Sequence, residues 1–224
     1  MRRVLFFILL FVSKAIWAQI PDAGTWLAIQ VPVNISKKWQ WHNDAGYRTL
    51  GASISPYQFL YRTGARFTFN KKWSTAGGVA FFYTRSSYQK FNREFGGEFR
   101  LWQELNGQHP ISKSISLQNR VRTEQRWFAK TDDRSAYFGF RFRYRVAATK
   151  LLNDKWSIQL ANEYMRQQAN NSFTFNQNRL ILTALYKFNP TSQLQGGYMW
   201  LKWPAESQHI ATFTFQKIIS LHGK

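Results

Sequence analysis

The chain has 224 residues, of which 44% are hydrophobic and 18% aromatic, and it contains no cysteine. Without cysteine, a disulfide framework, a thiolate metal site and a lipoprotein anchor are all excluded. Lysine and arginine number 31 against 11 acidic residues, but they alternate with apolar residues instead of forming a basic run or helix, so no nucleic-acid partner is expected.

Residues 1–18 have the layout of a secretory signal peptide. Arg2 and Arg3 precede an apolar run over residues 4–12, and small residues surround a cleavage position at Ala18. The apolar run is far shorter than the roughly 20 residues that a helix needs to span a bilayer. We therefore expect cleavage after Ala18 and a single exported domain over residues 19–224, with an uncleaved interfacial helix as the alternative.

The remaining chain reads as a succession of long strands. They are predicted at residues 25–36, 39–50, 57–69, 73–85, 92–104, 114–128, 136–150, 156–168, 175–188, 193–203 and 209–219. Most are at least 11 residues long, whereas strands of globular proteins commonly have about 5 to 6 residues. Strands of this length can cross a bilayer at a tilt, and no window is apolar enough for a helical span.

The alternation is clearest in residues 137–146, which read Y-F-G-F-R-F-R-Y-R-V. Successive side chains of a strand point to opposite faces, so rings such as Phe140 share one face while Arg141, Arg143 and Arg145 share the other. An arginine facing lipid costs about 2–4 kcal/mol at the bilayer midplane. The pattern therefore predicts an all-β, transmembrane, antiparallel up-and-down β-barrel with lipid-facing rings and lumen-facing arginines.

The eleven predicted runs conflict with the even strand number of bacterial single-chain barrels, so within a range of 10 to 12 strands we favour ten or twelve. Tight turns are predicted at residues 36–38, 70–72, 153–155 and 189–192, with longer connections between them. Residues 106–113 belong with the tight turns by order but are longer. Tryptophans near strand ends predict aromatic girdles at the lipid headgroups: Trp26, Trp39, Trp73, Trp127, Trp156 and Trp203.

Alternation also places arginines and glutamates together on the inner face, as a charge network that is the candidate site. Its predicted members are Arg62, Arg66, Glu94, Glu98, Arg100, Glu104, Arg120, Arg122, Glu124, Arg126, Arg141, Arg143, Arg145, Glu163 and Arg179.

Facing residues of an antiparallel hairpin have nearly constant index sums, which predicts neighbours within this network. Arg62 is expected opposite Ala80, with Glu98 next to Ala80 on the following strand and therefore within reach of Arg62. The same arithmetic sets Glu98 beside Arg120 or Arg122. It also pairs Glu124 with Arg141, and Arg143 with Glu163.

Four functions stay open at this point. The first is a structural charge network inside a nearly filled barrel, and the second is a narrow pore that favours small anions, because bases outnumber acids. The third is a lipid hydrolase, but His42, His109, His209 and His222 have no evident serine neighbour, so no catalytic residue is predicted. The fourth is a soluble exported β-sandwich. No cofactor or metal site is predicted, the expected partner is the lipid bilayer of the outer membrane, and the oligomeric state is open.

Several segments carry a likeness to a known family. They read E-F-R-L-W-Q-E-L from Glu98, R-V-R-T-E-Q-R from Arg120, R-F-R-Y-R from Arg141, N-E at Asn162, F-N-Q-N-R-L from Phe175 and G-G-Y-M from Gly196. In these segments and their order the chain resembles an uncharacterised family of predicted outer-membrane barrels, domain-of-unknown-function family 2490. The resemblance implies an outer-membrane barrel, and it implies no reaction or ligand because the family has none assigned.

Overall fold

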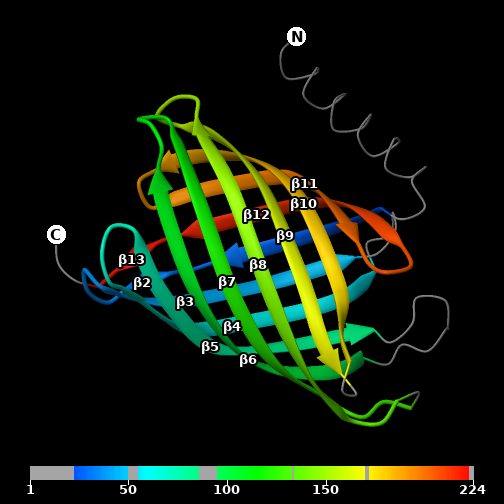
Figure 1. Ribbon diagram of the computed structural model, residues 1–224. Coiled ribbons are helices and arrows are strands. Elements are labelled where there is room, and N and C mark those ends of the chain that lie inside the picture. The colour runs from blue at the N-terminus through cyan, green and yellow to red at the C-terminus, as the bar shows by residue number, and fades with distance from the viewer. Residues whose placement is uncertain (1–22, 50–54, 86–94, 133, 170–171, 222–224) are drawn as a thin grey trace.

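A computed structural model of the chain describes residues 23–49, 55–85, 95–132, 134–169 and 172–221 (Figure 1). The predicted signal segment, Glu94 of the predicted network and His222 lie outside these ranges. The described residues contain no helix that is long and apolar enough to cross a membrane.

The described chain forms a meander in which consecutive strands from β2 to β12 are paired antiparallel. Their bounds are β1 Ala23–Gln30, β2 Val33–Asn34, β3 Trp39–Thr49, β4 Pro56–Thr68, β5 Trp73–Arg85, β6 Phe95–Pro110, β7 Ile115–Phe128, β8 Tyr137–Leu151, β9 Trp156–Ala169, β10 Ser172–Asn189, β11 Ser192–Lys202, β12 Ser207–Lys217 and β13 Ile219–Ser220.

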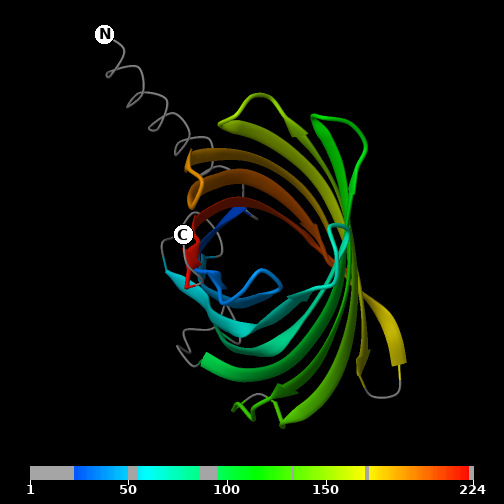
Figure 2. The same ribbon diagram turned by 90° about the vertical axis from the view of Figure 1, so that its left-hand side faces the viewer.

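The sheet closes on itself because β1 pairs antiparallel with β3 on one side and parallel with β12 on the other. Figure 2 shows the resulting ring of strands. β1 and β2 are one strand interrupted at Val31 and Pro32, since proline has no backbone N–H to donate. β12 and β13 are likewise one strand interrupted at Ile218. Counted this way, the described residues form a closed barrel of eleven strands.

The predicted fold class, an all-β transmembrane-type barrel with a meander topology, is confirmed, whereas the preference for ten or twelve strands is wrong. A meander of eleven leaves its first and last strands running in the same direction, so closure requires a parallel pair. That pair extends from Ala23 opposite His209 to Gln30 opposite Gln216. The β-sandwich alternative is also wrong, because a single sheet closes into a ring.

Two connections are shorter than the sequence indicates. β6 continues to Pro110, which faces Ser116 on β7, so the expected long connection over residues 106–113 is a tight turn. β9 reaches Ala169 and β10 begins at Ser172, which shortens the connection expected between the predicted strands 156–168 and 175–188. In both hairpins the pairing of the strands continues through residues that look like loop in the sequence.

Four of the tight turns share one construction, and they gather at one end of the barrel, here called the tight-turn rim. Asn70 Oδ1 accepts hydrogen bonds from the backbone N–H groups of Lys72 and Trp73 at 2.8 and 3.0 Å. Ser36, Ser112 and Asn153 make the equivalent pairs of bonds. These turns place six lysines at the tight-turn rim: Lys37, Lys38, Lys71, Lys72, Lys113 and Lys155.

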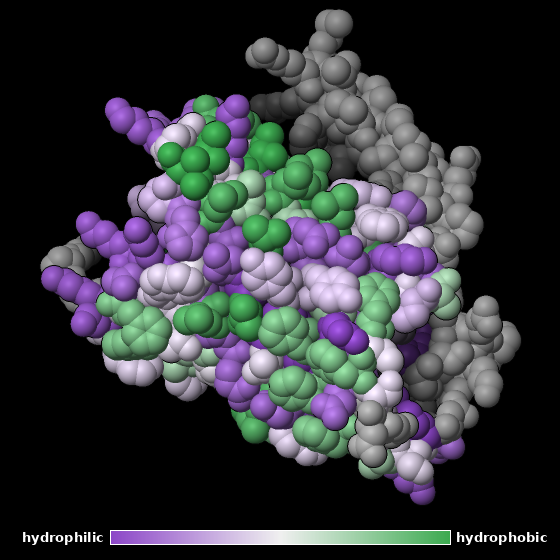
Figure 3. Space-filling view, in the orientation of Figure 1, coloured by the Kyte–Doolittle hydropathy of each residue, from purple (hydrophilic) through white to green (hydrophobic). Residues whose placement is uncertain are grey.

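The outer wall is apolar and the inner wall is charged, as the alternation predicts. Phe138 is 51% exposed on the outer wall while Arg141 is 5% exposed inside. Rings pack side by side along the outside, with Trp127 5.6 Å from Phe99 and 5.3 Å from Phe138 between ring centroids. Figure 3 shows hydrophobic and aromatic side chains across this wall and hydrophilic ones gathered at the end that carries the tight turns.

Four of the six tryptophans are exposed near strand ends, as the girdle prediction requires, whereas two are not, so the prediction is wrong for these two. The exposed ones are Trp39, Trp73, Trp127 and Trp156. Trp26 and Trp203 instead line the lumen and pack against a buried cluster of Met199, Leu201 and Ile210. Trp26 precedes Leu27, which is exposed on the outer wall, so alternation sends the Trp26 ring inward.

A pair of facing glycines makes room for an inward tryptophan. Trp102 is 2% exposed and lies over Gly64 and Gly78, which face each other across β4 and β5. A Cβ atom on Gly78 would lie 2.1 Å from the backbone oxygen of Thr63, and one on Gly64 would lie 2.7 Å from the Trp102 ring. The close approach of these strands therefore requires glycine.

We expect Gly78→Ala to lower the free energy of unfolding by about 2–3 kcal/mol, because overpacking shifts backbone as well as side chains. The measurement is urea unfolding of protein refolded into phospholipid vesicles, followed by tryptophan fluorescence. Gly97→Ala is the matched control, since its new Cβ would meet nothing closer than 3.7 Å. Equal unfolding midpoints for the two variants would contradict this account of the glycine pair.

Candidate functional site

The inner faces of β3 to β10 carry a dense set of opposite charges. Within the described ranges these faces bear eleven arginines, namely Arg48, Arg62, Arg66, Arg100, Arg120, Arg122, Arg126, Arg141, Arg143, Arg145 and Arg179. They bear five carboxylates, namely Asp44, Glu98, Glu104, Glu124 and Glu163. All predicted network members that the structure describes are among them.

Two glutamates form the centre of the network. Glu124 accepts hydrogen bonds from Arg141 Nε at 2.9 Å and from Arg143 Nη1 at 2.7 Å. Glu163 accepts from Arg143 Nη2 at 2.7 Å and from Arg120 Nη2 at 2.5 Å. Arg143 therefore bridges the two carboxylates, and both glutamates are 2% exposed. Charge-assisted bonds of this kind are about twice as strong as neutral ones.

Glu98 has a two-arginine clamp. Arg100 donates to it from Nε at 2.5 Å and from Nη2 at 2.8 Å, and Arg126 donates from Nε at 2.6 Å. Arg100 also stacks on Phe82, with its guanidinium carbon 3.5 Å from the ring centroid. A buried guanidinium is thus satisfied both by a carboxylate and by a ring face.

Glu104 is surrounded by three arginines. Arg122 donates to it from Nε and Nη2 at 2.8 and 2.6 Å. Arg66 Nη2 and Arg120 Nη1 approach it from further away, at 3.4 and 3.8 Å. Asn106 donates a fourth contact at 3.0 Å. Arg66 is therefore the loosest member of this group, held by a single long hydrogen bond.

The structure brings three of the expected pairs of neighbours together. Glu124 pairs with Arg141, and Arg143 pairs with Glu163. Arg62 faces Ala80 across its hairpin.

The expected approach of Arg62 to Glu98 is wrong. Ala80 faces Arg100, so the next register is shifted by two residues. Arg62 binds Asp44 through Nε at 2.9 Å, and the described residues contain no Arg62–Glu98 ion pair. Glu98 pairs with Arg126 instead of Arg120 or Arg122.

Sequence reasoning missed two lumen residues, Asp44 and Arg48. Asp44 lies opposite Arg62 and accepts a contact from His42 Nε2 at 3.2 Å. Arg48 donates to Gln58 at 2.6 Å and lies 3.7 Å above the Trp26 ring. A signal for both was present, because they have the same parity in β3 as His42, whose side chain lines the lumen.

On these strand faces the arginines outnumber the carboxylates by eleven to five, an excess of six positive charges. Two arginines show this directly, since neither contacts a carboxylate among the described residues. Arg145 donates to Gln159 at 2.5 Å, and Arg48 donates to Gln58. A charge out of bulk water is costly unless it is compensated. On these strand faces, part of the positive charge therefore has no carboxylate to compensate it.

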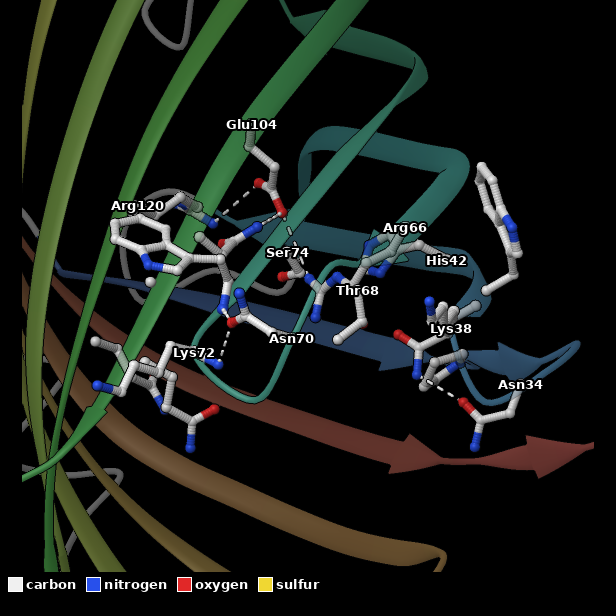
Figure 4. A pocket seen from close by; sticks show the side chains of 18 of the residues that line it. Asn34, Lys38, His42, Arg66, Thr68, Asn70, Lys72, Ser74, Glu104 and Arg120 are labelled. Atoms are coloured by element: carbon white, nitrogen blue, oxygen red, sulfur yellow. Dashed lines mark hydrogen bonds and ion pairs between the residues drawn. The ribbon is translucent and has the colours of Figure 1, made fainter.

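Two cavities lie within the charged barrel. One, near the tight-turn rim, has a volume of about 640 Å³, and the other, toward the longer connections, about 1100 Å³. Figure 4 shows side chains that line the first cavity. Both cavities are lined by Gln30, Arg62, Arg120 and Arg145. The two cavities therefore adjoin at these three arginines.

The three described histidines form side-chain contacts with residues other than serine. His42 contacts Asp44, His109 contacts Asn119 at 3.4 Å, and His209 Nδ1 lies 2.6 Å from the Tyr198 hydroxyl. The described ranges hold no group of three or more histidine and carboxylate side chains arranged for a metal ion.

We expect Glu124→Gln to lower the free energy of unfolding by about 3–5 kcal/mol, because it leaves Arg141 and Arg143 buried without their shared carboxylate. The measurement is again urea unfolding in vesicles. The control is Glu206→Gln, the same change at an exposed position between β11 and β12. An equally small effect of both substitutions would contradict a stabilising role for Glu124.

The chain is similar to solved structures and to a protein family. The NanC porin, solved in a rhombohedral crystal form, is 12% identical, with a TM-score of 0.48 over 77% of this chain and 78% of that one. OmpT, an outer membrane protein of Vibrio cholerae, is 15% identical, with a TM-score of 0.43 over 75% of this chain and 51% of that one. No curated protein matches in sequence. The model of the family "Protein of unknown function (DUF2490)" matches residues 23–206, and the chain belongs to that family.

Proposed function

We propose that this chain is an integral outer-membrane channel that favours small anions and that it is exported by a signal peptide cleaved after Ala18. No enzymatic activity is part of the proposal.

The outer wall supports insertion in a bilayer. Its exposed side chains are large and apolar, as at Leu160 and Leu182, and tryptophans lie toward both ends of the strands. A closed sheet leaves no unpaired strand edge, so its backbone polar groups are satisfied within the hydrocarbon. In outer-membrane barrels the short turns face the periplasm, which would orient the tight-turn rim toward that side.

The observation that carries the anion preference is the charge of the lumen. Five carboxylates compensate fewer than half of the eleven arginines, and the two cavities adjoin at Arg62, Arg120 and Arg145. Basic side chains around a pore attract anions and repel cations. A solute passing between the cavities would meet three guanidinium groups at their junction.

A second candidate, a barrel filled by a structural charge network, is favoured by the burial of Glu124 and Glu163. Both are 2% exposed and both bind Arg143, so this part of the lumen is occupied by paired side chains. The two candidates share the fold and the location. They differ in whether ions pass.

We expect single channels of the refolded protein in a planar bilayer, with a reversal potential in a salt gradient that indicates anion preference. Arg145→Gln should reduce that preference by about twofold or more, since it removes a junction charge without separating an ion pair. Lys150→Gln, an exposed lysine outside both cavities, removes the same charge and should leave the preference unchanged.

Each result of this recording decides between the candidates. Folded protein without conductance would replace the channel by the structural network. A cation preference would overturn the anion proposal. Equal effects of Arg145→Gln and Lys150→Gln would show that the arginines between the two cavities do not set the preference.

The export step has its own test. Protein purified from the outer-membrane fraction should begin at Gln19 when its N-terminus is sequenced or its intact mass is measured, because Ala18 ends the small-residue cleavage site. An N-terminus at Met1 in that fraction would contradict cleavage and favour an interfacial helix.

A further inference from the structure

We infer that the 640 Å³ cavity at the tight-turn rim, here called the rim cavity, is a binding site for a polyvalent oxyanion of the phosphate or polycarboxylate class. The inference rests on the proposed anion channel and names the class of solute that one end of it holds.

The charge of the rim cavity is more one-sided than that of the rest of the lumen. Among the described residues, its lining contains a single carboxylate, Glu104. The basic residues of its lining are Lys37, Lys38, Arg62, Arg66, Lys71, Lys72, Arg120, Arg122 and Arg145. Arg62 and Arg120 are paired with Asp44 and Glu163 outside the lining, but the other basic residues still outnumber Glu104. This excess favours a ligand that carries several negative charges over a monovalent one, because each added charge gains attraction from the whole lining.

Two buried guanidinium donors in this lining have no acceptor. Arg66 Nε and Arg120 Nε make no hydrogen bond within the described structure. Both side chains border Glu104, which lies between them in Figure 4. A buried donor without a partner is unfavourable, so oxygen atoms of a bound anion would accept the hydrogen bonds that Glu104 does not.

The lysines of the site are positioned by the turns. Lys72 follows Asn70, whose Oδ1 accepts from the Lys72 backbone N–H, and Lys38 is held in the same way by Ser36. Neither lysine forms an ion pair among the described residues. Figure 4 shows Lys38 and Lys72 at the lining of the cavity, together with hydroxyl groups of Thr68 and Ser74.

The size of the rim cavity suits a small solute. Its volume is within the roughly 300–1,000 Å³ that is typical of small-ligand sites. A phosphate-class or citrate-sized anion would fit with its first waters. Arg66, held only by its long bond to Glu104, is the residue best placed to turn toward such a ligand.

Titration calorimetry of the refolded protein in neutral detergent tests the site without requiring conductance. We expect pyrophosphate and citrate to bind saturably, about tenfold or more tighter than acetate. The double variant Lys38→Gln with Lys72→Gln, and separately Arg66→Gln, should weaken pyrophosphate binding about tenfold. Lys113→Gln with Lys155→Gln is the matched control, because these lysines belong to the same rim but do not line the cavity.

The outcomes separate this inference from the channel. Saturable binding without conductance would support the site and remove the channel, whereas anion conductance without saturable binding would remove the site alone. An equal loss of pyrophosphate affinity in the two double-lysine variants would overturn the site, because it would mean that the overall positive charge of the rim attracts the anion. If vesicles containing phosphatidylglycerol bind the lysine rim while pyrophosphate and citrate do not, the lysines hold lipid headgroups and the inference is wrong.

Discussion

The separation of guanidinium groups from hydrocarbon is the constraint on which the whole molecule depends. Eleven lipid-facing arginines at about 2–4 kcal/mol each would exceed the stability of an ordinary domain, which is about 5–15 kcal/mol. The arginines of this network therefore share the inner faces of β3 to β10, and most of the exposed rings lie on the outer wall. Once both faces are assigned, only a closed sheet leaves no strand edge exposed to lipid.

The inner face then has to compensate its own charge, and it does so incompletely. Glu124 and Glu163 bind several arginines each, with Arg143 shared between them. Arg48 and Arg145 rely on glutamine oxygens and, for Arg48, on a tryptophan ring. The same arrangement that stabilises the barrel wall leaves a positive interior, so structural and anion-binding roles arise from one set of side chains.

Closure is achieved by local departures from a regular strand. Pro32 interrupts the first strand, yet its carbonyl oxygen accepts from Ile219 N at 3.0 Å, so the parallel seam continues past the break. Gly64 and Gly78 let β4 and β5 approach under Trp102. The glycine pair makes room for the Trp102 ring inside the barrel. The interrupted first strand still forms the parallel pair that an odd number of strands requires.

The sequence by itself determined the faces, most strand positions and the inner set of arginines and glutamates, because side-chain alternation is a local property of extended chain. It also contained the parity that places Asp44 and Trp26 inside. Only the tertiary structure decided that β1 and β12 pair in parallel, that Ala80 faces Arg100, and that Arg62 binds Asp44. Register across a longer connection and closure between the chain's two ends depend on contacts between distant residues, which no local period encodes.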